Sequence, residues 1–399
     1  MTTSRKMTLL CYAAMMSLAI GLNLLPVFLT SLKIAFGPDN ILSQEQLGRL
    51  GAVTFGGLVV GILMTGPMAD RWGAKAFALI GNALIAVSLI AMSCSPSYFF
   101  LCVALFFLGL GSGILDMVLS PIVSALNPEN RAVAMNWLHS FYCVGAVVTI
   151  LAGTLALEVG LSWRMCCLLL LPLPLYLLWA FAPLGFPQMV EEGSRTSLRS
   201  LLKDKWFIVA IIAIFLGGAT ELGMAQWLPA YAETALKFPL WVSGTSLLLF
   251  SLAMAGGRMA IGAWGGKIDP YLIMAWGCGT SVILFLCGSF LPSPWLALAA
   301  CIAAGFTGSA LWPTMLAVSA DRHPEGGASM FGALAAMGNA GGIFMPWVVG
   351  WIADNSDLHW GLAVSALAPL CMLPLVLWLR LTSGMSSSAV ATVAGQGRN

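Results

Sequence analysis

The stretch AIIAIFLGGATELGMAQWLPAYAETAL, residues 210–236, is almost entirely apolar and is long enough to cross a lipid bilayer as a helix. Glu221 lies near its middle. A charged acidic side chain at the centre of a bilayer costs about 3 kcal/mol even on insertion scales. The stretch therefore predicts a membrane span whose acidic residue faces protein or water rather than lipid.

The whole chain has the composition of an integral membrane protein. Of its 399 residues, 59% are hydrophobic and 9% are charged, and the mean hydropathy is +0.92. Soluble domains are about 45–50% apolar and about 25% charged. The apolar runs are continuous and about 20 residues long, which predicts helices rather than the short alternating strands of a membrane barrel. The first run, residues 7–32, is too long for a signal peptide and is expected to be retained.

Polar and turn-rich breaks divide the chain into twelve predicted spans. The predicted class is an all-α membrane protein with an N-terminal six-helix bundle at 1–186, a cytoplasmic linker at 187–205, and a C-terminal six-helix bundle with a short cytoplasmic tail at 206–399. The spans are expected near residues 7–33, 46–69, 76–95, 97–125, 133–157, 162–186, 206–232, 240–263, 270–291, 294–320, 328–353 and 358–380.

The basic residues orient these spans. If both termini are cytoplasmic, 14 of the 18 Lys and Arg residues fall on the cytoplasmic side, as the positive-inside rule expects. This predicts a multi-pass protein of the plasma membrane, or of the inner membrane in a Gram-negative cell. The cytoplasmic set is Arg5, Lys6, Arg71, Lys75, Arg131, Arg195, Arg199, Lys203, Lys205, Arg258, Lys267, Arg322, Arg380 and Arg398, and the outer set is Lys33, Arg49, Arg164 and Lys237.

Two pairs of similar sequence segments indicate an internal duplication. NPEN at 127–130 follows the fourth span, and HPEG at 323–326 follows the tenth. GPMADRWGAK at 66–75 follows the second span, and GRMAIGAWGGK at 257–267 follows the eighth. A parallel repeat of six plus six helices is the plan of many secondary transporters, whose halves rock about a site near the membrane midplane.

The loop at 66–75 also has a physical interpretation. Its two glycines allow a close helix approach and a tight turn. Its acidic residue can face the positive N-terminus of a neighbouring helix, and its basic residues can lie at the lipid headgroups. An ordinary charged loop is the alternative. The residues concerned are Gly66, Asp70, Arg71, Gly73 and Lys75.

These same five residues resemble the signature loop between spans two and three of the major facilitator superfamily, from which Ala74 departs at a usually basic position. In the second half, Gly257–Arg258 resembles the start of the corresponding loop. The resemblance implies the major facilitator fold and a loop that acts as a cytoplasmic gate during alternating access. Arg131 and Arg258 are interpreted as further gate or headgroup residues.

Three longer patterns resemble the fucose:proton symporter branch of that superfamily. They are NWLHSFYCVGAV at 136–147, WLPAY at 227–231, and MGNAGGIFMPWVVGWIAD at 337–354. The resemblance implies proton-coupled import of a small hydrophilic solute such as a sugar. Proton-coupled efflux of drugs or metabolites is the alternative. It is less favoured because Ala146 follows Gly145 where drug antiporters carry a Gly-Pro pair.

The deep ionisable residues are the candidates for proton coupling. They are Asp116, Glu221 and His139, each of which would be costly facing lipid. A carboxyl group in a low-dielectric site can exchange a proton near neutral pH. Asp116 is the first candidate, because the symporter branch carries an acid at a similar place. A structural hydrogen bond is the alternative for each residue.

Substrate binding is expected of polar and aromatic side chains in the spans. Tryptophan faces pack against sugar rings, and amides or carboxylates bond hydroxyl groups, although packing is the alternative throughout. Because no Lys or Arg is expected in the middle of a span, an anionic substrate is disfavoured and a neutral one is predicted. The candidates are Asn23, Asn136, His139, Glu221, Gln226, Trp227, Trp312 and Asn339.

Other functions are disfavoured. The net charge of +2 suggests no nucleic-acid partner. The ten cysteines lie in or beside apolar runs without a CxxC pair, and the three histidines are far apart in the sequence, so neither a metal site nor an enzyme is expected. The predicted partners are a small neutral solute, protons and the bilayer, with no cofactor and with a monomer as the functional unit.

Overall fold

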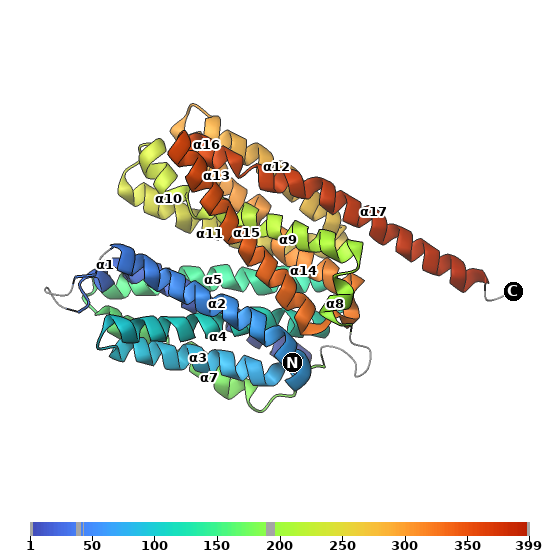
Figure 1. Cartoon of the computed structure of the whole chain (residues 1–399), viewed down its shortest axis with the longest axis horizontal. Coiled ribbons are helices and arrows are strands. Elements are labelled where there is room, and N and C mark those ends of the chain that lie inside the picture. The colour runs from blue at the N-terminus through green and yellow to red at the C-terminus, as the bar shows by residue number, and fades with distance from the viewer. Residues whose placement is uncertain (1–2, 37–40, 43, 189–195, 397–399) are drawn as a thin grey trace. The chain divides into compact units, whose positions relative to one another are not determined.

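The structure, a computed structural model, describes residues 3–36, 41–42, 44–188 and 196–396. Over these residues the chain is helical and contains no strand (Figure 1). Twelve helical segments in this part of the chain are long and apolar enough to cross a membrane. The predicted all-α class with twelve spans is confirmed. Arg195, Arg398 and residues 189–195 of the predicted linker lie outside the described residues.

The first six spans are formed by seven helices. Five are continuous, and the sixth span is a pair. They are α1 (Thr3–Lys33), α2 (Gln44–Trp72), α3 (Ala74–Cys94), α4 (Tyr98–Leu126), α5 (Arg131–Glu158), and α6 (Trp163–Leu169) with α7 (Pro172–Phe181). Only Gly73 separates α2 from α3, and its backbone has a φ of 83°, a left-handed conformation that glycine adopts readily.

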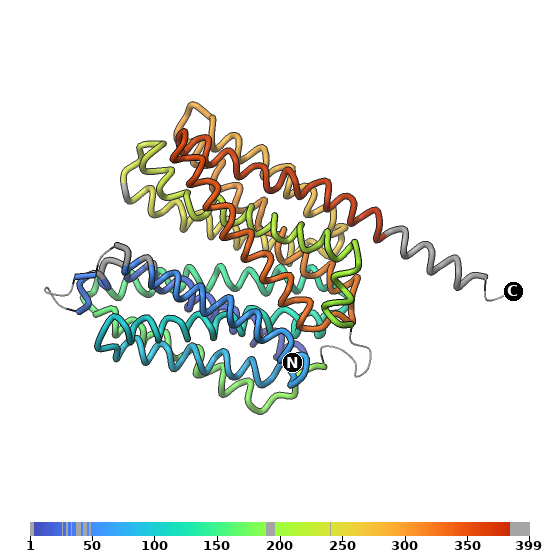
Figure 2. Tube along the Cα trace, viewed as in Figure 1, coloured from blue at the N-terminus to red at the C-terminus, as the bar shows by residue number. Residues whose placement is uncertain are grey.

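The later spans follow after the short helix α8 (Leu198–Leu201). Figure 2 traces the chain through them. They are α9 (Lys205–Ala225) with α10 (Leu228–Ala230) and the π turn η1 (Tyr231–Ala235), α11 (Leu240–Trp264) with η2 (Gly265–Lys267), α12 (Pro270–Phe290), α13 (Pro294–Gly308) with α14 (Leu311–Arg322), η3 (Pro324–Gly326) with α15 (Gly327–Asn355), and α16 (Leu358–Val364) with α17 (Leu367–Gln396).

The chain forms two compact units. The first comprises Met1–Glu129, Trp137–Arg195 and Glu325–Ala336, and the second comprises Asn130–Asn136, Thr196–Pro324 and Met337–Asn399. Each unit therefore includes one short helix end from the other half of the chain. The division into bundles at 1–186 and 206–399 stays a prediction.

Four spans are interrupted shortly before a proline. Proline has no N–H, so the carbonyl four residues earlier loses its helical donor. Other prolines lie inside continuous helices of the described chain, among them Pro67, Pro121, Pro346 and Pro374, so proline alone does not decide where a span breaks. The interrupting prolines are Pro172, Pro229, Pro313 and Pro369.

Glycines bring α4 into close contact with its neighbours in the first unit. A Cβ on Gly109 would overlap the carbonyl oxygen of Thr54 in α2, and one on Gly113 would overlap that of Leu58. A Cβ on Gly111 would meet the carbonyl oxygen of Gly81 in α3 at 2.8 Å. These glycines, in the sequence GLGSG at 109–113, therefore allow α2, α3 and α4 to approach one another closely.

Gly109→Ala is expected to lower the free energy of unfolding by about 1–3 kcal/mol, because the new methyl group meets backbone that cannot move aside without shifting a helix. Melting of the purified protein in detergent tests this. Gly279→Ala is the matched control, because a Cβ at that helical position meets nothing within 4 Å. Equal melting temperatures for the two variants would contradict the packing argument.

Candidate functional site

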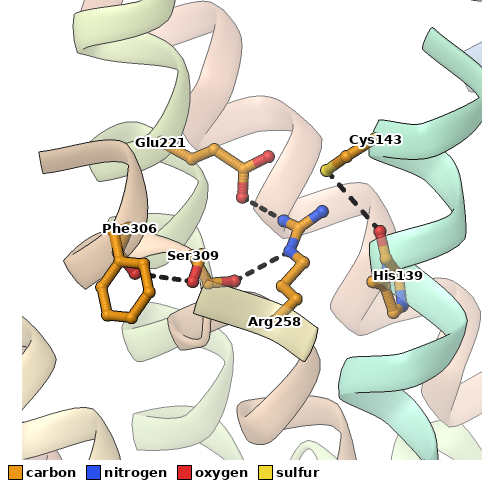
Figure 3. Close-up of polar contacts among 6 residues, drawn as sticks. All are labelled: His139, Cys143, Glu221, Arg258, Phe306 and Ser309. Atoms are coloured by element: carbon orange, nitrogen blue, oxygen red, sulfur yellow. Dashed lines mark hydrogen bonds and ion pairs between the residues drawn. The ribbon is translucent and has the colours of Figure 1, made fainter. Parts of the chain in front are cut away.

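An ion pair lies deep in the second unit. Nη2 of Arg258, on α11, donates to Oε2 of Glu221, on α9, at 2.6 Å (Figure 3). The two side chains are 3% and 13% exposed. A buried guanidinium and carboxylate satisfy each other's charge, which accounts for an acidic residue in the apolar stretch at 210–236.

A helix break fixes the position of the arginine. Pro313 has no N–H, so the carbonyl of Ser309 lacks its usual donor. Nε of Arg258 donates to that carbonyl at 2.9 Å. Gly257 makes this possible, because a Cβ there would overlap Ser309 Oγ and the carbonyl oxygen of Phe306. The break between α13 and α14 thus supplies a backbone acceptor that orients the guanidinium, as the contacts in Figure 3 show.

Two sequence-based interpretations are wrong at this point. Arg258 is 2% exposed and holds Glu221, which contradicts a position at the headgroups, while its role as a gate residue stays a prediction. It follows that a span does carry a buried cation, contrary to the expectation that disfavoured anionic substrates. Counting residues along a span does not show where the guanidinium lies, because the arginine side chain is long.

Trp312 packs between glycines beside this pair. A Cβ on Gly218 of α9 would lie 3.1 Å from its indole Cζ3, and one on Gly338 of α15 would lie 2.5 Å from the same atom. Gly218 and Glu221 are three residues apart on one helix, so they share a face. The indole therefore packs about one helical turn along α9 from Glu221, the partner of Arg258.

The other predicted substrate ligands of the second unit lie on α5, at the end of α9 and on α15, and their binding roles stay predictions. Trp227 donates from Nε1 to the carbonyl of Pro346 at 2.9 Å and packs on Gly350. Gln226 follows α9 as its C-cap and is exposed. Asn136 is buried and donates to Thr314 Oγ1 at 3.0 Å. Asn339 is half-buried on α15.

The candidates of the first unit lie on α1, α4 and α5. Asn23 donates to the Ala19 carbonyl at 2.9 Å and lies 3.5 Å from the Tyr142 hydroxyl. Asp116 is half-buried on α4. Nε2 of His139 lies 3.5 Å from Ser120 Oγ, while its carbonyl accepts a contact from Cys143 Sγ at 3.8 Å (Figure 3). Their roles in coupling and binding stay predictions.

In the first unit, Asp70 of the predicted gating loop caps a helix. Oδ1 of Asp70 accepts from the N–H of Ala328 at 2.7 Å, and Oδ2 accepts from the N–H of Ser329 at 2.9 Å and from its hydroxyl. Asp70 thus caps the N-terminus of α15, the geometry that its charge predicted. A Cβ on Gly66 would lie 3.4 Å from this same backbone.

The basic gate residues differ in their surroundings. Arg71 is exposed and Lys75 is half-buried, as headgroup residues would be. Arg131, in the second unit, donates from Nη1 to Oδ1 of Asp321 at 2.6 Å. The sequence analysis missed Asp321, Ser329 and Ser309 as partners. The proline at 313 was the available signal for Ser309, but it does not identify the donor.

Asp70→Asn is expected to destabilise the protein by about 1 kcal/mol, since an amide has one acceptor oxygen where the carboxylate offers two to backbone donors. Its neighbour Arg71→Gln is the control, because that exposed side chain is expected to change the melting temperature little. Thermal melting of both variants in detergent measures the difference. A melting temperature for Asp70→Asn equal to that of the wild type would show that the cap contributes nothing.

Comparison with known proteins identifies the family. A model of the Major Facilitator Superfamily matches residues 9–302 and 273–396. The cis,cis-muconate transport protein of Acinetobacter baylyi is 24% identical over 381 residues, covering 90% of each chain. The gentisate transporter of Corynebacterium glutamicum is 27% identical over 272 residues, covering 61% of this chain and 59% of that one.

The fold agrees with a solved transporter. The structure of the Escherichia coli fucose:proton symporter FucP in its outward conformation superposes with a TM-score of 0.80 and 16% identity, covering 95% of this chain and 99% of that one. At this identity the likeness shows the fold alone. The family match covers most of the sequence, and the helices agree with it in number and length. The chain therefore belongs to the Major Facilitator Superfamily and is a membrane transporter.

Proposed function

We propose that this transporter imports small planar organic acids together with protons by alternating access, in the plasma membrane and with both termini in the cytoplasm. The observation that carries the proposal is the guanidinium of Arg258, 3% exposed and held in place by a backbone carbonyl. Guanidinium groups recognise carboxylates through paired, charge-assisted hydrogen bonds.

Two further observations support acids as the substrate class. The indole of Trp312 packs on Gly218, one helical turn along α9 from Glu221, and offers a flat apolar surface for a conjugated or aromatic ring. The relatives named for muconate and gentisate carry substrates of this chemistry, a carboxylate on a planar conjugated frame. Neither observation requires a substrate hydroxyl group.

This proposal replaces the neutral solute favoured by the sequence. That preference rested on the expected absence of a buried cation and on the resemblance to the fucose:proton symporter branch, and the burial of Arg258 removes the first of these two grounds. Sugar import and drug efflux remain as outcomes that the experiment below distinguishes.

Uptake into proteoliposomes tests the proposed function. With an acidic exterior, radiolabelled gentisate and cis,cis-muconate are expected to accumulate, whereas fucose, xylose and a lipophilic cation are not. A protonophore should abolish accumulation. Liposomes without protein are the control, because protonated acids cross bilayers unaided. Accumulation of a sugar alone would support the neutral-solute symporter, and proton-driven export of the lipophilic cation would support efflux.

A further inference from the structure

We propose that His323 is a pH-sensitive latch that, when protonated, pairs with Asp204, holds the start of α9 to the end of α14, and slows the transport cycle as its side of the membrane acidifies. The direction of this regulation rests on the proposed function, in which that side is the cytoplasm and imported protons accumulate there. The latch itself rests on contacts around the imidazole, within the second unit.

His323 joins the ends of two spans. It is the C-cap of α14 and is 9% exposed. Its Nε2 lies 3.2 Å from Oδ2 of Asp204, the half-buried N-cap of α9. Oδ1 of the same carboxylate accepts from the N–H of Trp206 at 2.9 Å. The carboxylate therefore caps α9 with one oxygen and faces the imidazole with the other.

Two aromatic rings of α9 pack against the imidazole. The ring centroids of Trp206 and Phe207, both buried, lie 5.6 Å and 5.9 Å from that of His323 in edge-on arrangements. Trp206 is held in turn by α17, because its Nε1 donates to Ser383 Oγ at 3.1 Å. This packing keeps the imidazole beside Asp204, so a charge on the ring acts on a fixed partner.

A proton on the imidazole turns this contact into an ion pair. Histidine ordinarily gains its charge between about pH 8 and pH 5, where a carboxyl group ordinarily stays ionised. Partly buried opposite charges attract each other and are screened little by salt. The stabilisation is therefore fully present at low pH and is lost as the pH rises and the imidazole gives up its proton.

The end of α14 also contacts a third span. Arg131, at the start of α5, donates from Nη1 to Oδ1 of Asp321 at 2.6 Å, two residues before His323. The junction thus joins the ends of α5, α9 and α14 in the second unit. A movement that separates the ends of α9 and α14 must break the latch, so a stronger latch opposes it.

The other charged groups at this end ordinarily titrate outside the range from about pH 5 to pH 8, so a response within it points to His323. Besides the pair of Arg131 with Asp321, Arg380 pairs with Asp269 at 2.7 Å. The charged and titratable groups that α5, α8, α9, α12, α14, α17 and η3 bring near this end, among the described residues, are Arg131, Arg199, Lys203, Asp204, Lys205, Asp269, Tyr271, Asp321, Arg322, Glu325 and Arg380.

A double-mutant cycle at two pH values tests the latch without any substrate. At about pH 5.5, His323→Gln and Asp204→Asn should be coupled by about 1–3 °C in melting temperature, and at about pH 8 most of this coupling should be gone. Asn is as good an N-cap as Asp, so Asp204→Asn keeps the cap and removes the charge. A coupling that is the same at both pH values, or absent at both, would overturn the latch.

His359→Gln is the matched control. His359 also lies in the second unit, but its Nδ1 contacts the carbonyl oxygen of Ser289 at 2.8 Å, an acceptor without a full charge. Its loss should add to that of Asp204→Asn at both pH values. If His323→Gln does not fold, imidazole NMR still decides, because the chain has three histidines. The signal that survives both His139→Gln and His359→Gln must titrate between about pH 5 and pH 8, and a signal that does not would refute the latch.

Gentisate uptake measures the regulation. In proteoliposomes with both termini in the lumen and a fixed exterior pH, a more acidic lumen weakens the driving force equally for every variant. The ratio of the His323→Gln rate to the wild-type rate therefore isolates the latch. From about pH 7.5 to about pH 6 in the lumen, this ratio is expected to rise by about two- to fivefold, the range that a partly exposed ion pair supports. An unchanged ratio would overturn the regulation. If the wild type takes up neither gentisate nor cis,cis-muconate, the proposed function fails, while the melting cycle still decides the latch.

Discussion

Replacing both members of the buried ion pair with methionine is expected to leave the protein more stable than replacing either one. Arg258→Met removes the cation that holds Glu221, and Glu221→Met removes the carboxylate that holds Arg258. Breaking a buried pair by removing one partner destabilises by about 3–5 kcal/mol, whereas an apolar replacement of both is often neutral. The double variant should therefore recover most of the loss but should transport no acid.

The two single variants should also differ from each other. A carboxylate that loses its partner can take up a proton and become neutral, but a guanidinium stays charged at any relevant pH. Glu221→Met is therefore expected to destabilise more than Arg258→Met. Lowering the pH should restore stability to Arg258→Met alone.

Unfolding in mixed micelles, analysed as a double-mutant cycle, measures the coupling between the two positions. The ion pair of Arg380 with Asp269 is the matched control. Its atoms lie 2.7 Å apart, yet its side chains are 42% and 32% exposed, and such a pair contributes about 0–1 kcal/mol. Additive losses at Glu221 and Arg258 would contradict a mutually neutralising buried pair.

The spans could be predicted because the signal for each of them is local. Residues 206–232 were predicted as one span, and the structure has a candidate span at Lys205–Ala235. Length and hydropathy decide such a segment without reference to the rest of the chain. The prediction that Glu221 avoids lipid follows from the same local cost, and the residue is 13% exposed.

The site could not be predicted because it joins side chains from different helices. Arg258 lies in the segment 257–267, whose sequence resembles the loop at 66–75 and where Arg258 takes the position of Pro67. Its depth was inferred from its distance to the end of the span. Its actual partners are set by Gly257, which allows close packing, and by the carbonyl freed by Pro313. Pro67 and Pro121 lie in continuous helices, so the sequence does not show which proline opens a span.

Trp312→Ala is expected to destabilise the protein by about 3 kcal/mol, because the indole fills the space that Gly218 and Gly338 leave open. If the ring also supports a planar substrate, as proposed, the variant should bind gentisate more weakly while keeping its preference for acids over sugars. A variant that is destabilised but binds gentisate normally would limit Trp312 to packing.

A compensating substitution on the facing helix tests this contact directly. Gly338→Ala alone is expected to destabilise by about 1–3 kcal/mol, because its Cβ would lie 2.5 Å from indole Cζ3 and 2.6 Å from Cη2. In a Trp312→Leu background the same alanine meets no indole and should partly fill the space that the smaller side chain leaves. The double variant should therefore melt above Trp312→Leu, a reversal of sign that two independent sites cannot produce. Additive losses would mean that Gly338 is needed for a reason other than the tryptophan.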